Sequence, residues 1–231
     1  SFEVVNGQLK MKDSVSANYE SKNSYSITVT ATDAAGLTTS HEFTLAVNDV
    51  NEAPTSITLS ASTIEENDLG AIVGTLISTD DDFGDTHTYT LSGADADAFE
   101  IVNGFQLKLK DGVSADYETQ NTYSVTVTAT DTEGATASQS FSVTVNDTND
   151  VPILVNALTD QNSDEDSAFS FAVPANTFND VDAGDSLTYA ATLSDGSALP
   201  SWLSFDASTR TFTGTPLNDD VGAITAKVTA V

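Results

Sequence analysis

Acidic and amide side chains are concentrated in a short stretch that occurs twice in the chain. The stretch Asn146–Pro152, NDTNDVP, recurs 98 positions earlier as Asn48–Pro54, NDVNEAP. Hard cations such as calcium take about six to eight oxygen ligands from carboxylates, amides and carbonyls, so these residue types at this spacing predict a metal site. Each copy closes on a proline, which cannot donate to a β-ladder and holds φ near about −65°, as is typical of a stiff junction between domains.

Composition narrows the classes of protein that fit. The 231 residues allow one large domain or two to three small ones, and the repeat favours the small ones. With 35 acidic and 7 basic residues the formal charge is −28, which excludes nucleic acid and anionic membranes as natural partners and favours cations. No apolar run approaches the roughly 18 residues of a membrane span, so we expect no span in this fragment. The chain has no cysteine, so metal ions are the expected substitute for disulfides.

The elements that must position these side chains are strands. In 25–33, Tyr25, Ile27, Val29 and Ala31 alternate with hydroxyl residues, the period-two pattern of a half-buried strand, and Phe43 opens the same pattern in the next strand. The glycine turn at 33–36 separates the two strands. Amphipathic helical patterns are scarce, so the predicted class is all-β.

The back half of this pattern returns in residues 99–152. Further strands are predicted near 57–60, 71–78 and 86–92, separated by the acidic segments 65–70 and 79–85. About seven short strands in some 98 residues favour a Greek-key sandwich. The third segment, 153–231, keeps the acidic front half at 164–166 and 180–185 and then diverges, with the segments 199–206, 211–216 and 220–222 following it.

The order of five acidic motifs within one 98-residue unit resembles a cadherin repeat. The motifs are Glu66-Asn67, Asp80-x-Asp82, Asp116-Tyr117-Glu118, Asp131 before a glycine turn, and Asp147-x-Asn149-Asp150-x-Pro152. The resemblance covers 53–152 and, for its back half only, 1–52. It implies tandem Greek-key, immunoglobulin-like or cadherin-like β-sandwiches in a linear array, with Ca²⁺ between consecutive repeats.

Carried over residue by residue, the resemblance assigns ligands to two junctions. The first would use Glu20, Asp49, Asn51 and Glu52 together with Asp80, Asp82 and Asp131. The second would use Glu66, Asp116, Glu118, Asp147, Asn149 and Asp150 together with Asp180 and Asp182. Asn18 stands where the family has an aspartate, and the half-repeat contains no counterpart of Glu66, the glutamate of the Glu-Asn motif. The first junction is therefore expected to bind metal less well.

Residues 151–231 resemble a dystroglycan-type cadherin-like module. The domain boundaries expected from both resemblances are 1–52 for the C-terminal part of a repeat, 53–150 for a complete repeat and 151–231 for a module truncated at its end. Strand edges left unpaired at both cut ends are expected to favour strand exchange between molecules.

The same acidic and aromatic residues allow three other interpretations: an EF-hand, a carbohydrate-binding surface and a glycosidase. The DxD stretches do not fit an EF-hand, because the sixth position is Asp85 or Asp185 instead of glycine. Trp202 and Tyr89 are candidate carbohydrate-stacking residues, although the apolar neighbours of Trp202 favour a core position. Duplicated acids in linkers do not fit a glycosidase pair, so no enzymatic activity is expected.

Two functions follow from these readings. The first is a calcium-rigidified adhesion or spacer segment of a bacterial surface or secreted protein that mediates cell-cell or protein-protein contact. Its expected partners are calcium and like or related cadherin-like modules, including homophilic contact between identical modules. The second is a calcium-dependent, polysaccharide-binding accessory segment of a secreted polysaccharide-degrading protein.

Overall fold

The computed structural model describes all 231 residues and is almost entirely β-structure, with two short 3-10 turns, Ala96–Ala98 and Asn218–Asp220. The predicted all-β class is confirmed. Contacts within the chain separate two compact units, Ser1–Asn146 and Asp147–Val231. The three-part division at 52 and 150 stays a prediction. No helix has the length and apolar character that crossing a bilayer requires.

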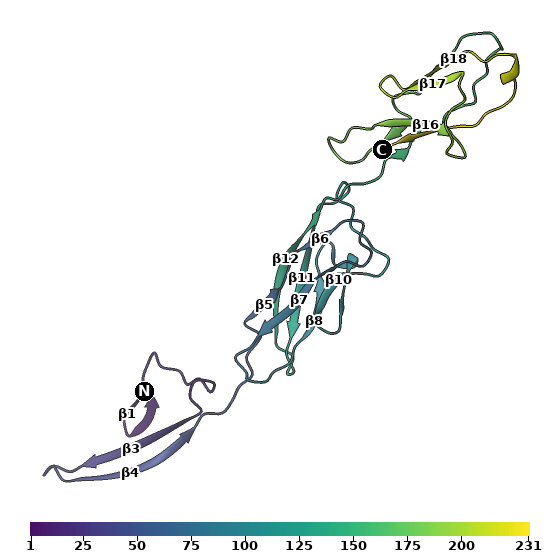
Figure 1. Cartoon of the computed structure of the whole chain (residues 1–231). Helices are drawn as coiled ribbons and strands as arrows, with labels where there is room; N and C mark the ends of the chain where they lie inside the picture. Colours follow the sequence, from purple (N-terminus) through teal and green to yellow (C-terminus); the bar gives the residue numbers. More distant parts are fainter. The chain divides into compact units, whose positions relative to one another are not determined.

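The complete repeat, residues 53–146, is a sandwich of two four-stranded sheets (Figure 1). One sheet has the order β5-β7-β10-β9, and the other has the order β6-β12-β11-β8. Only β6 runs parallel to its neighbour, with Thr63–Glu65 beside Thr144–Asn146. The strands are β5 (Ser56–Leu59), β6 (Thr63–Glu65), β7 (Ile72–Thr79), β8 (Thr88–Ser92), β9 (Phe99–Val102), β10 (Gln106–Leu109), β11 (Thr122–Thr130) and β12 (Thr136–Asn146).

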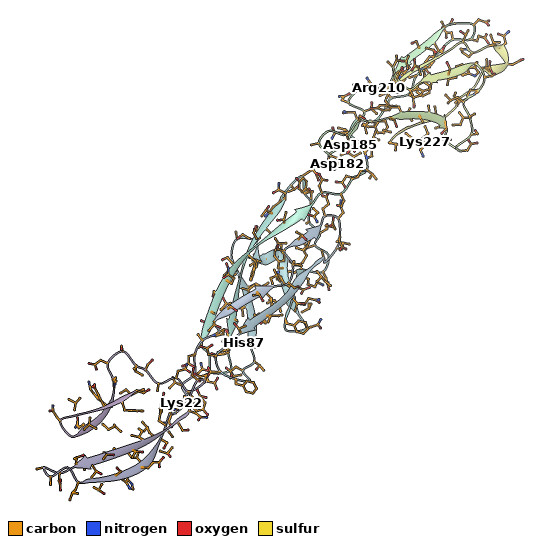
Figure 2. All side chains as sticks on the ribbon, turned by 60° about the vertical axis from the view of Figure 1, so that its left-hand side comes forward. Lys22, His87, Asp182, Asp185, Arg210 and Lys227 are labelled. Atoms are coloured by element: carbon orange, nitrogen blue, oxygen red, sulfur yellow. The ribbon has the colours of Figure 1, made fainter.

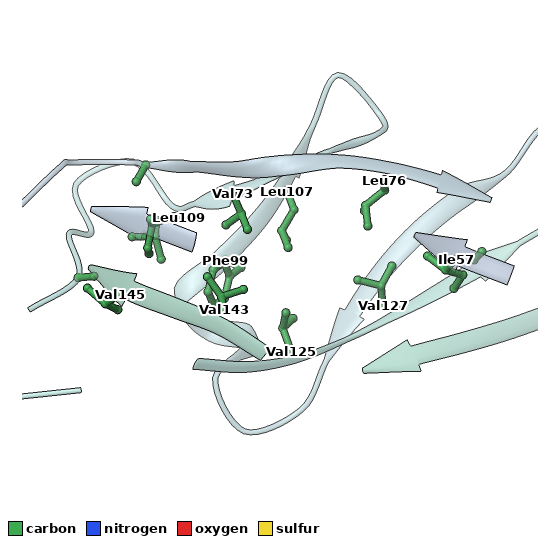
Figure 3. Packing of buried hydrophobic residues seen from close by; sticks show 14 residues of the cluster. Ile57, Val73, Leu76, Phe99, Leu107, Leu109, Val125, Val127, Val143 and Val145 are labelled. Atoms are coloured by element: carbon green, nitrogen blue, oxygen red, sulfur yellow. The ribbon is translucent and has the colours of Figure 1, made fainter. Parts of the chain in front are cut away.

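The core of this repeat is formed by the alternate side chains of both sheets, which meet face to face (Figure 3). In β11, Val125, Val127 and Ala129 are fully buried, while the hydroxyl residues between them face outward. Leu107 and Leu109 of β10 fill the opposite sheet and are equally buried. The alternation expected for half-buried strands is therefore realised on both sheets.

The half-repeat, residues 1–47, forms two separate hairpins. They consist of β1 (Phe2–Val5) with β2 (Gln8–Met11), and β3 (Ser24–Thr32) with β4 (Thr38–Ala46). The edge-to-face contact of Phe2 with Tyr25, at 5.1 Å between ring centroids, has a counterpart at 5.7 Å in Phe99 and Tyr123 of the complete repeat. Of the predicted inward face of β3, however, only Ile27 is buried. The strands form as expected, but without an opposing four-stranded sheet their apolar side chains stay exposed.

The C-terminal unit is built from smaller sheets. Three strands have the order β14-β18-β17, and two pairs, β13-β15 and β16-β19, accompany them. The strands are β13 (Ile153–Leu154), β14 (Phe169–Ala172), β15 (Phe178–Asn179), β16 (Tyr189–Leu193), β17 (Leu203–Asp206), β18 (Thr211–Gly214) and β19 (Ala226–Ala230). Its core centres on Val173, Leu203 and Phe212. A Cβ on Gly214 would lie 2.1 Å from the carbonyl oxygen of Trp202, so glycine is required for this close approach.

Leu107 and Leu9 occupy equivalent places in β10 and β2, but Leu107 has no exposed surface and Leu9 is 36% exposed. We expect Leu107→Ala to lower the free energy of unfolding of the complete repeat by about 2–5 kcal/mol, because a cavity remains. Leu9→Ala is the matched control and should cost less than about 1 kcal/mol. Calorimetry and circular dichroism of both variants measure the difference, and equal costs would contradict the assigned core.

Candidate metal centres

Four groups of carboxylates lie at the ends of strands and in the loops. Within the first unit they are Glu20, Asp49 and Asp82; Asp80, Asp85 and Asp131; and Glu66, Asp116 and Glu118. The C-terminal unit contributes Asp180, Asp182 and Asp185. In each group one ligand oxygen per residue lies within 4.8 Å of the others. Oxygens that bind one calcium ion at about 2.3–2.6 Å cannot be much farther apart than this, so the spacing fits.

The residues predicted for the first junction fall into two neighbouring groups that the linker joins. Asn51 donates from Nδ2 to Asp131 at 3.0 Å, and the Glu52 backbone N–H donates to Asp82 at 2.8 Å. Asn51 Nδ2 also donates to the Glu52 carbonyl at 3.0 Å, which fixes the amide orientation. The linker is thereby held against the DxD loop and the turn that follows β11.

Asp131 is buried and is held by a turn that its own side chain organises. Its Oδ1 accepts the backbone N–H groups of Glu133, Gly134 and Ala135 at 3.0, 2.6 and 2.8 Å. The pKa of Asp131 is lowered, first by the hydrogen bond from Asn51 and then by these backbone donors, against the opposing effect of burial. Asp131 therefore stays ionised, as a metal ligand must.

Two other carboxylates of this region are destabilised in their charged form. The pKa of Glu52 is raised by desolvation and then by Glu20, Asp82, Asp49 and Asp81. The pKa of Asp85 is raised by desolvation and then by Glu133, Asp80, Asp82 and Asp131. Both shifts reflect first the loss of water around the carboxylate and then the neighbouring negative charges, and a bound cation would oppose both effects.

The Glu66 group is ordered by backbone contacts. Glu66 is 3% exposed, and its Oε2 accepts the Tyr117 N–H at 2.8 Å, which places it beside Asp116 and Glu118. Asp116 accepts the Thr119 N–H at 2.8 Å. Asn18, the corresponding residue of the half-repeat, accepts the Ser21 N–H at 2.6 Å. The asparagine thus preserves the turn while lacking the charge.

The Asp180 group repeats features of the first junction within the C-terminal unit. The Asp150 N–H donates to Asp182 Oδ2 at 2.7 Å, as the Glu52 N–H does to Asp82, and Asn149 Nδ2 donates to the Asp150 carbonyl at 2.7 Å. Asp182 and Asp185 lie close together at one end of this unit (Figure 2). Asp147 belongs to the same connecting segment and lies outside the four groups.

Two shielded carboxylate oxygens have no hydrogen-bond partner: Asp85 Oδ2 and Asp182 Oδ1. A buried carboxylate oxygen without a donor costs free energy, and both oxygens lie among other carboxylates. A hard cation satisfies them directly, so the residues present fit calcium.

Asp85 and Asp185 are the ligand candidates that the sequence reasoning missed. Both are the sixth residue of a DxDxGD-like segment, the position used to exclude an EF-hand. Both aspartates occupy the same place in two related segments, and this recurrence could have identified them as ligand candidates. His87 was also missed as a neighbour: its Nε2 lies 2.9 Å from Asp80 Oδ2, in a largely buried pair.

The two candidate carbohydrate residues pack against the cores. Tyr89 contacts the core of the complete repeat, and its hydroxyl accepts from Ser78 at 3.0 Å. Trp202 packs against Leu203 and Phe212 and is partly exposed, which is less burial than a full core position. Neither ring stands out as an exposed platform for a sugar.

Comparisons with known proteins agree with this fold. The family model described as a putative Ig domain matches residues 151–231. The structure is similar to protocadherin gamma B2 extracellular cadherin domains 3–6, with a TM-score of 0.61, 18% identity and coverage of 99% of this chain and 61% of that chain. It is also similar to mouse cadherin-23 EC22-24, with a TM-score of 0.57, 19% identity and coverage of 94% of this chain and 71% of that chain.

The cis-dimer structure of protocadherin gammaB7 EC3-6 is a third match, with a TM-score of 0.57, 22% identity and coverage of 98% of this chain and 60% of that chain. This chain thus spans about 60% of the length of these two protocadherin chains. No curated protein matches the sequence. These likenesses establish a cadherin-like fold.

Asn51→Ala should raise the pKa of Asp131, because it removes the largest cause of its lowering. A lowered folded pKa stabilises the fold above the unfolded pKa, and this stabilisation is lost as pH falls through the folded pKa. The variant should therefore lose less stability on acidification. Carboxyl NMR titration without calcium measures the pKa, with Asn149→Ala as the control. An unchanged Asp131 pKa in Asn51→Ala would contradict the assigned contact.

Proposed function

We propose that this chain is a calcium-binding adhesion or spacer segment of an extracellular protein. The observation that carries the proposal is the pair of shielded, unpartnered oxygens, Asp85 Oδ2 and Asp182 Oδ1, each inside a group of carboxylates. At about 4 Å, two such charges repel by roughly 4 kcal/mol at an effective dielectric constant near 20. A divalent cation converts this repulsion into attraction.

The donor chemistry favours calcium over softer metals. The grouped ligands are carboxylates, with the Asn51 and Asn149 amides beside them, and the chain has no cysteine. Hard cations prefer such oxygen ligands, and calcium tolerates the irregular geometry of loops better than magnesium does. We assign the residues predicted from sequence to this role and add Asp85 and Asp185.

Calcium would act on shape more than on folding. The complete repeat has its own buried core, so its β-structure does not depend on metal. The segments 48–54 and 147–152 carry little apolar surface, and ions bound beside them restrain their backbone. A chain of this kind transmits force or holds a partner at a distance, as the cadherin-like fold supports.

The proposal extends to the location, the origin, the domain boundaries and the partners of the chain. We infer an extracellular or cell-surface location and a bacterial origin from the cysteine-free composition and module type. The boundaries 1–52, 53–150 and 151–231 and the dystroglycan-type character of the last module belong to this inference. Like or related modules are the inferred partners. Nothing in the sites calls for catalysis, and the packing of Trp202 and Tyr89 does not favour polysaccharide.

Calcium titration followed by calorimetry tests the sites. We expect binding in the range of roughly 10⁻⁴–10⁻³ M, with the step at the second junction tighter, because Asp116 and Glu66 are acids there. Asp150→Ala should abolish the tighter step and Asp49→Ala the weaker one. Asp219→Asn, which removes an exposed acid outside the groups, is the control. Equal loss of both steps in either variant would contradict the assignment.

Removal of calcium with EDTA tests the effect on shape. Circular dichroism should show the β-structure retained, while small-angle scattering should show a wider range of molecular dimensions as the carboxylates lose their counter-ions. Sodium chloride at matched ionic strength is the control for screening. An EDTA-treated protein with the same scattering as the calcium form would refute the proposed stiffening.

A further inference from the structure

His87 directly precedes β8, at one end of the complete repeat (Figure 2). His87, Tyr89 and Leu91 are half-buried and alternate with exposed residues, so His87 continues the inward-facing set of this strand. Tyr89 and Leu91 pack against the core. His87 is therefore the inward position next to the DxD loop, and its side chain is only 9% exposed.

The imidazole of His87 and the carboxylate of Asp80 form a shielded pair. Nε2 lies 2.9 Å from Asp80 Oδ2, and the Asp80 side chain is 4% exposed. An ionised carboxylate only accepts hydrogen bonds, so the hydrogen of the imidazole lies on Nε2 and is donated to Oδ2. The Asp82 N–H donates to the other oxygen, Oδ1, at 3.3 Å. Donors on both oxygens fix the rotation of the Asp80 carboxylate.

His87 lies outside the group of candidate ligand oxygens. Asp80, Asp85 and Asp131 each offer one oxygen within 4.8 Å of the others, and His87 is not part of this group. Its hydrogen bond therefore reaches the group through Asp80. The imidazole is placed to orient a ligand and not to act as one.

The C-terminal unit shows what the same position holds when no histidine is present. Leu187 follows Asp180 at the spacing at which His87 follows Asp80, and it is half-buried in the same alternating pattern. Asp180 Oδ1 accepts the Asp182 N–H at 3.1 Å, as Asp80 Oδ1 accepts the Asp82 N–H. Leucine fills the inward position but has no donor. Packing at this position thus does not require histidine, and what histidine adds is its hydrogen bond.

Repulsion within the group makes such a hydrogen bond useful. Three carboxylates held this close favour rotation of Asp80 away from Asp85 and Asp131 when no cation is bound. A donor on Asp80 Oδ2 opposes that rotation. A neutral imidazole does so without the positive charge with which a lysine would compete with calcium.

We propose that His87 is a positioning residue for the calcium group of Asp80, Asp85 and Asp131. Its Nε2–H holds the Asp80 carboxylate in the binding orientation before the ion arrives. This inference rests on the proposed function, because it takes the group to bind calcium. Hydrogen bonds that orient a ligand from behind account for about 10–100-fold in metal affinity in other proteins. The Asp180 group has no such donor at position 187.

Calcium titration followed by NMR tests the role of His87. Gly84 and Gly184 occupy equivalent places in the two DxD loops, so their amide signals report the two groups separately. His87→Leu, which copies Leu187, should weaken calcium binding at Gly84 by about tenfold and leave Gly184 unchanged. His87→Gln, which places an amide N–H close to the position of Nε2, should restore most of the affinity. Thr86→Ala, at an exposed residue of the same loop, is the control.

The hydrogen bond itself is tested in the calcium-free wild type. Nitrogen-15 NMR of the imidazoles should place the hydrogen of His87 on Nε2, and His41→Gln assigns the signals because the chain has two histidines. A hydrogen on Nδ1 of His87 would overturn the proposal even if the leucine variant does not fold. Wild-type affinity in His87→Leu, or no recovery in His87→Gln, would overturn it too. If neither glycine responds to calcium in the wild type, the proposed function fails as well.

Discussion

A sheet whose strands alternate apolar and polar side chains has one face that must be covered, and this requirement organises the whole chain. The complete repeat satisfies it with two four-stranded sheets, so Val125, Val127 and Leu107 lose all exposure. The half-repeat has closely similar strands but lacks the opposite sheet, and Val29 remains 40% exposed where its counterpart Val127 is buried. The same sequence pattern therefore produces a buried core or an exposed apolar face, depending on whether a second sheet lies opposite.

Covering both faces also determines where the charges are. Inward positions are apolar and outward positions on the long strands are mainly hydroxyls, so most of the 35 acidic residues fall in loops and strand ends. Loops from neighbouring strands meet at the ends of a sandwich, which concentrates carboxylates there. The raised pKa values of Glu52 and Asp85 and the lowered pKa of Asp131 are two consequences of one arrangement. Desolvation and then neighbouring carboxylates disfavour the charged forms of Glu52 and Asp85, while local hydrogen-bond donors keep Asp131 ionised.

Much of this arrangement could be predicted from residues alone, because period-two alternation and repeated motifs are local signals. The strands around Ile57, Val73 and Val125 form close to their predicted places. Burial could not be predicted in the same way, because it depends on a distant partner, as the exposed Val29 and Phe43 show. Trp202 likewise packs on the core yet lines a cavity, which the apolar residues beside it in the sequence do not reveal.

The candidate ligands also divide into those that the sequence predicts and those that only the folded structure identifies. Motif order led to Glu66 and Asp116, and the structure groups them because Glu66 accepts a hydrogen bond from Tyr117, 51 residues away. Asp85 was not identified because the first acids of a DxD loop resemble a metal motif, whereas the last is recognised only when the loop folds back toward Asp131. Grouping by contact thus adds what spacing in the sequence cannot provide.

The net charge of the chain affects how closely two copies can approach each other. A formal charge of −28 keeps copies apart at low ionic strength. Cations bound at the carboxylate groups would lower that repulsion. Metal binding would therefore change the distance at which copies repel each other as well as the local geometry of the carboxylate groups.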